Sequence, residues 1–188
     1  MKFSHQILLI SMLAASAVAP AAAQPSATPA EPFDAPISAT TSATTSAANP
    51  VPQITGKTVD GAPFKLAALK GKVVLVMFWS TGCAVCRDKM PELRSNYEGW
   101  AGKPFELVAI SVDARVQDVR EYERILSKAV PLKQRFVQLW AGDASYQDNL
   151  GKPASLPAAY LIDKTGKVVA RYVGRIPPEA WDKISDLL

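Results

Sequence analysis

Residues that bind metal ions are scarce in this sequence. Its 188 residues include two cysteines, Cys83 and Cys86, and one histidine, His5. A structural zinc site needs about four ligands, so a zinc site within one chain would have to recruit carboxylates. The pair would also be a weak structural staple, because a disulfide closing so short a loop contributes only about 2 kcal/mol on the chain-entropy estimate. The sequence therefore predicts no metal site and favours another use for the two thiols.

A long hydrophobic run is also lacking. The apolar stretch Ile7–Ala19 has about 13 residues, whereas a membrane-spanning helix needs about 20. Lys2 precedes it and the Ala21–Ala23 triplet follows it as an A-x-A cleavage site, an order typical of secretory signal peptides. We predict a signal peptide over residues 1–23 and a periplasmic location, where disulfides persist. An uncleaved membrane anchor is the alternative.

Blocks of like charge are missing as well. The 21 Lys and Arg and the 17 Asp and Glu give a net charge of +4, and the basic residues are spread along the chain. This spread argues against nucleic acid as a partner. Residues 24–50 are nearly all Ala, Ser, Thr and Pro, which cannot bury enough apolar surface to offset the ordering entropy. They are predicted to form a disordered linker, followed by one domain over residues 51–188.

Residues 51–188 alternate between strand and helix patterns. Gln53–Val59 and Ala62–Leu66 flank Asp60-Gly61 and predict a β-hairpin. The apolar run within Lys72–Trp79 predicts a strand buried on both faces, as in a sheet covered by helices on both sides. The other predicted elements are, in order, a helix over Ala84–Trp100, a strand over Phe105–Val112, a helix around Val116–Leu126 with Asp113 as its N-cap, a strand over Phe136–Trp140, a short helix near Asp143–Leu150, a hairpin of Ala158–Asp163 and Lys167–Val173, and a last helix from Pro177.

Both cysteines lie in one stretch, FWSTGCAVCRDKM (Phe78–Met90). It follows the apolar run and leads into the predicted helix from Ala84. A buried strand, a short loop and a Cys-x-x-C at the start of a helix together indicate a redox site. At a helix N-terminus, unpaired N–H groups and the helix dipole favour the thiolate of Cys83. Cys86 lies one turn deeper, where it can attack a mixed disulfide formed at Cys83.

Four segments together resemble the exported TlpA/ResA-like branch of the thioredoxin-fold oxidoreductases. They are Gly71–Val74, Phe78–Cys86, Met90–Leu93 and Ser155–Asp163. The resemblance covers about Pro52 to Leu188. It implies an α/β, thioredoxin-like fold, with a central mixed β-sheet flanked by helices, an N-terminal β-hairpin and a central αβ insertion. It also implies a thiol-disulfide oxidoreductase with Cys83 as attacking nucleophile, Cys86 as resolving thiol and no cofactor beyond their redox-active disulfide.

The resemblance adds a substrate site. Pro157 matches a proline that the family holds in cis before the strand facing the active site, so the Leu156 backbone would pair with an extended substrate chain. Trp79 is expected beside the cysteines and is assigned to the same substrate site. The alternative for Trp79 is a plain core position, and the two are compatible. An ordinary strand-opening proline is the alternative for Pro157.

Two residues depart from the family pattern. Met77 stands where many thioredoxins have a buried carboxylate below the resolving cysteine, and Lys89 stands where ResA-like members carry a glutamate. The proton acceptor for Cys86 therefore has no assignment, while Arg87 and Lys89 would favour thiolate.

Copper binding is disfavoured because copper-binding relatives use His or Met-rich ligand sets. Peroxidase chemistry is disfavoured because no proline precedes Thr81 in VLVMFWS.

The side chains of Ala84 and Val85 supply neither a cation nor a hydrogen-bond donor between the cysteines. Strong oxidants have such a group, which stabilises their reduced form. We therefore expect a reductase that acts on disulfide-containing exported proteins, with apocytochrome c or copper-assembly proteins as targets, and that a membrane thiol-electron transporter keeps reduced. A disulfide oxidase or isomerase and a non-catalytic peptide-binding module are the alternatives. The oligomeric state stays open.

Overall fold

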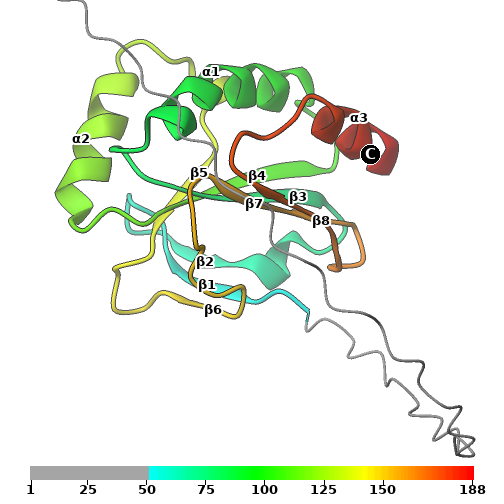
Figure 1. The fold of residues 1–188 in the computed structure, drawn as a ribbon, viewed down its shortest axis with the longest axis horizontal. Helices are drawn as coiled ribbons and strands as arrows, with labels where there is room; N and C mark the ends of the chain where they lie inside the picture. Colours follow the sequence, from blue (N-terminus) through cyan, green and yellow to red (C-terminus); the bar gives the residue numbers. More distant parts are fainter. Residues whose placement is uncertain (1–50) are drawn as a thin grey trace, which may run out of the picture. The chain divides into compact units, whose positions relative to one another are not determined.

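The computed structural model describes residues 51–188, so the predicted signal peptide and linker lie outside the described residues. Its larger sheet has five strands in the order β5-β4-β3-β7-β8 (Figure 1). These strands are β3 (Val73–Trp79), β4 (Phe105–Ser111), β5 (Val137–Trp140), β7 (Ala158–Ile162) and β8 (Val168–Val173). The pairs β3–β4 and β4–β5 are parallel, while β3–β7 and β7–β8 are antiparallel. The sheet is mixed, as the family resemblance implied.

Three helices of the described region cover one face of this sheet: α1 (Ala84–Gly99), α2 (Val116–Leu126) and α3 (Glu179–Leu187) (Figure 1). Alternate residues of β3 point towards them because side chains alternate along a strand. Leu75 and Met77 belong to the same buried cluster as Leu93 of α1, Val119 of α2 and Ile184 of α3. This cluster fixes α1, and with it both cysteines, above the central strand.

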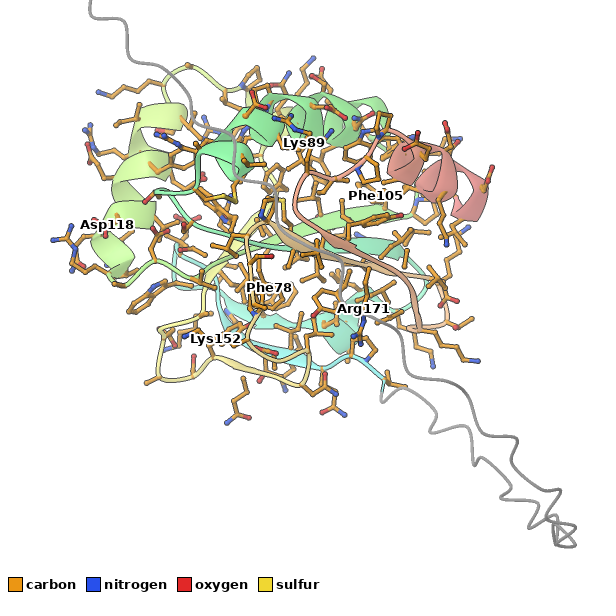
Figure 2. All side chains as sticks on the ribbon, viewed as in Figure 1. Phe78, Lys89, Phe105, Asp118, Lys152 and Arg171 are labelled. Carbon is orange, nitrogen blue, oxygen red and sulfur yellow. A yellow bond between two sulfur atoms is a disulfide. The ribbon has the colours of Figure 1, made fainter. Side chains whose placement is uncertain are left out.

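The other residues of β3 pack on a second, smaller sheet in the order β2-β1-β6. It consists of β1 (Ile54–Lys57), β2 (Pro63–Lys65) and β6 (Gln147–Asp148). Residues 51–188 also contain two short 3-10 turns, η1 (Leu66–Leu69) and η2 (Leu132–Gln134). Val76 and Phe78 lie in one buried cluster with Ile54 and Phe64. Figure 2 shows Phe78 on this side of the large sheet and Phe105 on the helix side.

All seven residues of β3 are buried, which confirms the predicted burial on both faces. The expectation that helices cover both faces was wrong, because the N-terminal hairpin and β6 cover the second face. The hairpin itself is confirmed, although its loop is longer than Asp60-Gly61, since the last register pair joins Lys57 to Pro63.

The short helix predicted near Asp143–Leu150 is absent, and this segment contributes strand β6 instead. Its polar side chains accept hydrogen bonds from backbone N–H groups. Asp148 accepts hydrogen bonds from the N–H groups of Leu150 and Gly151, and Asn149 accepts one from Gln53 N–H at 2.8 Å. Asp and Asn side chains that bind local backbone groups compete with helix formation, and Tyr146 packs against the smaller sheet.

Helix α2 begins later than its predicted N-cap. Arg115 occupies the N-cap position without a side-chain hydrogen bond, so Asp113 does not cap this helix. Helix α1 by contrast runs through Pro91 from Ala84 to Gly99, and its predicted core residues Met90 and Leu93 are buried.

The burial of β3 predicts a large cost for shortening its side chains. Leu75 is fully buried, whereas Leu132 is 77% exposed. We expect Leu75→Ala to lower the free energy of unfolding by about 2–5 kcal/mol, because a buried cavity adds to the lost transfer energy. Leu132→Ala, the matched control, should change it by less than about 0.5 kcal/mol. Urea denaturation of the two variants checks this, and equal effects would contradict the core described here.

Candidate redox site

The cysteine pair lies where the loop after β3 leads into the start of α1. After Trp79 a short loop, Ser80–Gly82, leads to Cys83, which is the N-cap residue of α1. Cys83 N–H donates to the Ser80 carbonyl at 3.1 Å, and the Cys83 Sγ accepts a hydrogen bond from the Cys86 N–H at 3.1 Å. The sulfur therefore takes the place of the oxygen that usually caps a helix.

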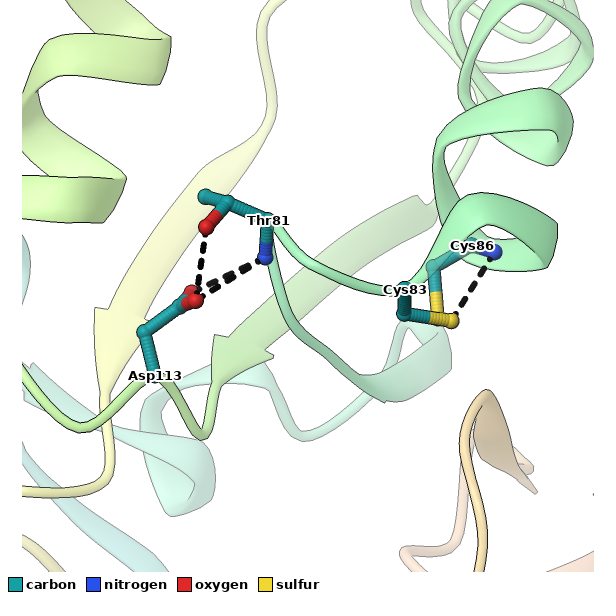
Figure 3. Close-up of a disulfide and its surroundings, with 4 residues drawn as sticks. All are labelled: Thr81, Cys83, Cys86 and Asp113. Atoms are coloured by element: carbon teal, nitrogen blue, oxygen red, sulfur yellow. Dashed lines mark hydrogen bonds between the residues drawn. A yellow bond between two sulfur atoms is a disulfide. The ribbon is translucent and has the colours of Figure 1, made fainter.

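Cys83 and Cys86 form a disulfide whose Cα atoms are 5.2 Å apart (Figure 3). Their exposures differ. Cys86 is fully buried in the helix-side cluster, whereas Cys83 is half-buried and its neighbours Ala84 and Val85 are exposed. A partner thiol or disulfide can therefore reach Cys83 first. This is the order of exposure that the sequence predicted.

The Leu156–Pro157 peptide bond is cis, as the family resemblance implied. Ala158 of β7 pairs with Phe78 of β3, so Pro157 lies beside the end of β3, next to the loop that carries Cys83. Its carbonyl accepts a hydrogen bond from Gly174 N–H at 2.8 Å. Leu156 is half-buried and packs against both core clusters. The sheet thus brings Leu156 and Pro157 to the same end of β3 as the disulfide.

Trp79 is fully buried. Its Nε1 donates to Gln138 Oε1 of β5 at 3.2 Å, and its ring lies 4.9 Å, centroid to centroid, from that of Tyr122 on α2. The assignment of Trp79 to substrate binding stays a prediction. Because Trp79 is buried, it can affect substrate binding only through the residues that it packs against.

A buried lysine follows the cysteines by one turn. Lys89 is 4% exposed, its Nζ lies 2.7 Å from Glu92 Oε2, and it sits 5.8 Å from the centre of the Trp181 ring of α3. Burial alone would raise the pKa of Glu92, but hydrogen bonds from Lys89 and Trp181 outweigh it and hold that pKa below its ordinary value. The charge of Lys89 is therefore compensated by Glu92 one turn further along α1, beside Trp181 of α3, which reduces its influence on the sulfurs.

Asp113 is the residue of this region whose role the sequence did not reveal. Its carboxylate accepts hydrogen bonds from the Thr81 N–H at 3.0 and 3.1 Å and from the Thr81 hydroxyl at 2.7 Å (Figure 3). The Ser111 hydroxyl donates to it as well, at 2.7 Å. The available signal was that Asp113 directly follows the predicted strand Phe105–Val112. A residue at that place can lie at the edge of the sheet near Cys83 or can cap the next helix, and the sequence does not distinguish the two.

Residues 47–171 match the AhpC/TSA family. The chain belongs to the AhpC/TSA family. Among its relatives is the thiol-disulfide oxidoreductase ResA of Bacillus anthracis, which is 28% identical over 127 residues, 65% of this chain and 67% of that protein. The thioredoxin-like protein YneN of Bacillus subtilis (strain 168) is 27% identical over 139 residues, 72% of this chain and 76% of that protein.

A solved relative has the same fold. The crystal structure of a thiol:disulfide interchange protein of the thioredoxin family from Chlorobium tepidum TLS superposes with a TM-score of 0.58 at 27% identity, and the match covers 73% of this chain and 93% of that one. The fold of this AhpC/TSA-family chain is therefore thioredoxin-like. With the Cys83–Cys86 pair in place at the start of α1, its enzyme class is that of the thiol-disulfide oxidoreductases.

Among the hydrogen bonds of residues 51–188, none joins an acidic side chain to the sulfur of Cys83 or Cys86. Met77 is fully buried in the same cluster as Cys86. An apolar environment disfavours the charged form of a thiol. Cys86 lies in such an environment, and its sulfur is bonded to that of Cys83. No group of three or more His, Cys, Asp or Glu side chains within residues 51–188 could hold a metal ion.

The difference in exposure predicts different outcomes for two serine variants. Cys83→Ser should reduce the rate of insulin disulfide reduction to that of the uncatalysed reaction, because the accessible sulfur is lost. In the Cys86→Ser variant, Cys83 should still attack and mixed disulfides should accumulate, since the resolving thiol is missing. Turbidity assays with dithiothreitol and non-reducing gels measure the two. Full activity in Cys83→Ser would favour a non-catalytic binding module.

Proposed function

We propose that this chain is an exported protein-disulfide reductase that works by dithiol exchange at Cys83 and Cys86. The observation that carries the proposal is a half-buried Cys83 at the N-cap of α1 above a fully buried Cys86. Export is supported by the predicted signal peptide. No helix within residues 51–188 is long and apolar enough to span a bilayer.

The reaction begins from the dithiol. The Cys83 thiolate attacks one sulfur of the substrate disulfide, forms a mixed disulfide and releases the other substrate sulfur as a thiolate, which takes up a proton. Cys86 then loses its proton and attacks Cys83 Sγ, which frees the second substrate thiol. The substrate has gained two electrons, and the enzyme ends with the Cys83–Cys86 disulfide. A membrane thiol-electron transporter, a dithiol donor, returns the two electrons.

Leu156 and Pro157 form the proposed binding site for the substrate chain. No hydrogen bond to residues 51–188 involves the backbone of Leu156, while Pro157 is anchored through its carbonyl to Gly174. An extended segment of an exported protein can pair with this backbone as an added strand. Pairing through the main chain places few demands on sequence, which suits a reductase with several targets. The family resemblance suggests apocytochrome c and copper-assembly proteins among them.

The reductive direction rests on the residues between the cysteines. Val85 is 41% exposed, and neither it nor Ala84 has a side chain that could donate to a thiolate. The first turn of α1 contains no acidic residue. Stabilisation of the reduced form thus comes from the helix N-terminus, without the additional donor that makes a strong oxidant.

The reduction potential of the cysteine pair tests this direction. Equilibration with glutathione buffers should give a value nearer that of thioredoxin, about −270 mV, than that of a strong oxidant, about −120 mV. Val85→His adds a donor beside Cys83 and should raise the potential by about 30 mV or more, which is a tenfold change in the exchange equilibrium. Val85→Leu is the matched control and should leave it unchanged. A wild-type value near −120 mV would make the oxidase alternative correct.

A further inference from the structure

The carboxylate of Asp113 is bonded to the loop that precedes the nucleophile. Its two oxygens accept from the backbone N–H and the hydroxyl of Thr81, two residues before Cys83. A carboxylate that accepts hydrogen bonds from both the backbone N–H and the side chain of one residue is usually close to that residue in sequence. Here it joins segments 32 residues apart, the end of β4 and the loop Ser80–Gly82.

Asp113 is itself held from several directions. Its N–H donates to Ser111 Oγ at 3.1 Å, the hydroxyl of the fully buried Ser111 donates back to its carboxylate, and its carbonyl accepts from Trp140 Nε1 at 2.8 Å. The indole of Trp140 in turn needs Gly142, because a Cβ on that glycine would overlap the ring. The position of Asp113 is thus fixed by β4 and β5 independently of the loop that it binds.

We propose that Asp113 is a positioning residue for Cys83: it holds Thr81 so that the sulfur of Cys83 stays aligned as the N-cap of α1. This inference rests on the proposed dithiol exchange, in which Cys83 attacks as a thiolate. Alignment matters because the Cys86 N–H and the positive end of the helix stabilise that thiolate only over a short range. A loop released from Asp113 lets Cys83 move away from these donors.

The charge of Asp113 has the opposite effect from its hydrogen bonds. A carboxylate near Cys83 disfavours the thiolate, so removing the charge alone would allow the thiolate to form at lower pH. Loss of alignment has the reverse effect, because the helix donors are lost. The other charged groups around this helix start are Arg87, the Asp88–Arg175 pair and the Lys89–Glu92 pair, and the substitutions proposed below leave them in place.

The experiment measures alkylation of Cys83 by iodoacetamide against pH in the reduced full-length protein, with Cys86→Ser as the background. Asp113→Ala should shift the midpoint of the rate profile upward by about half a pH unit or more. Thr81→Val, which loses the hydroxyl donor and retains the carboxylate, should shift it upward by less. Thr81→Ser should restore the wild-type midpoint.

Asp163→Ala is the matched control. Asp163 binds the N–H and hydroxyl of Thr165 in the β7–β8 turn with the same kind of contacts, so its loss should leave the midpoint unchanged. A downward shift in Asp113→Ala, no shift, or an equal shift in Asp163→Ala would overturn the proposal. Alkylation requires no substrate protein, so these outcomes can be read even if the wild-type chain fails to reduce disulfides, a result that would count against the proposed function alone.

Discussion

Seven consecutive apolar side chains of β3 have to leave water on both faces of one strand, and most of the fold follows from that requirement. One face receives the three helices, and the other receives the N-terminal hairpin with β6. A strand enclosed in this way cannot shift its register without moving its whole apolar set. The end of β3 is therefore a fixed point, and the cysteine loop, the start of α1 and the turn before β7 are all placed relative to it. Rigid placement of reacting groups is what a site with few polar side chains depends on.

The site was predictable where the chemistry is local in sequence. Cys83 and Cys86 lie three residues apart beside a strong strand signal, so helix geometry, together with the family resemblance, predicted the order of their exposure. Pro157 could be assigned only through the family resemblance, because a cis X–Pro bond leaves no mark in composition. Asp113 was misassigned because both of its uses, as a helix cap and as a partner for Thr81, look the same in sequence. Only the pairing of β3 with β4 distinguishes these two uses of Asp113. The helix predicted near Asp143–Leu150 was wrong for another reason, because a strand as short as β6 has too few residues to show a period.

The two residues near the sulfurs that depart from the family pattern have compatible surroundings. Met77 stands in place of a buried acid below Cys86. Lys89 stands in place of another acid and contacts Glu92 and Trp181. The space beneath the disulfide is thus apolar, and the Lys89–Glu92 ion pair lies within α1, on the side where Trp181 of α3 packs. A dithiol in such surroundings relies on the helix N-terminus and on the closeness of the two sulfurs, and less on a dedicated proton acceptor.

The capping role of Cys83 has a consequence for the whole reaction cycle. A helix cap made by Ser or Asp is purely structural, but here the acceptor is the atom that changes bonding partners. Its lone pairs face the Cys86 N–H in the disulfide, and a sulfur retains lone pairs as a thiolate and when joined to a substrate. The first turn of α1 can therefore keep its cap in all three states. The scaffold does not have to rearrange each time that the nucleophile turns over.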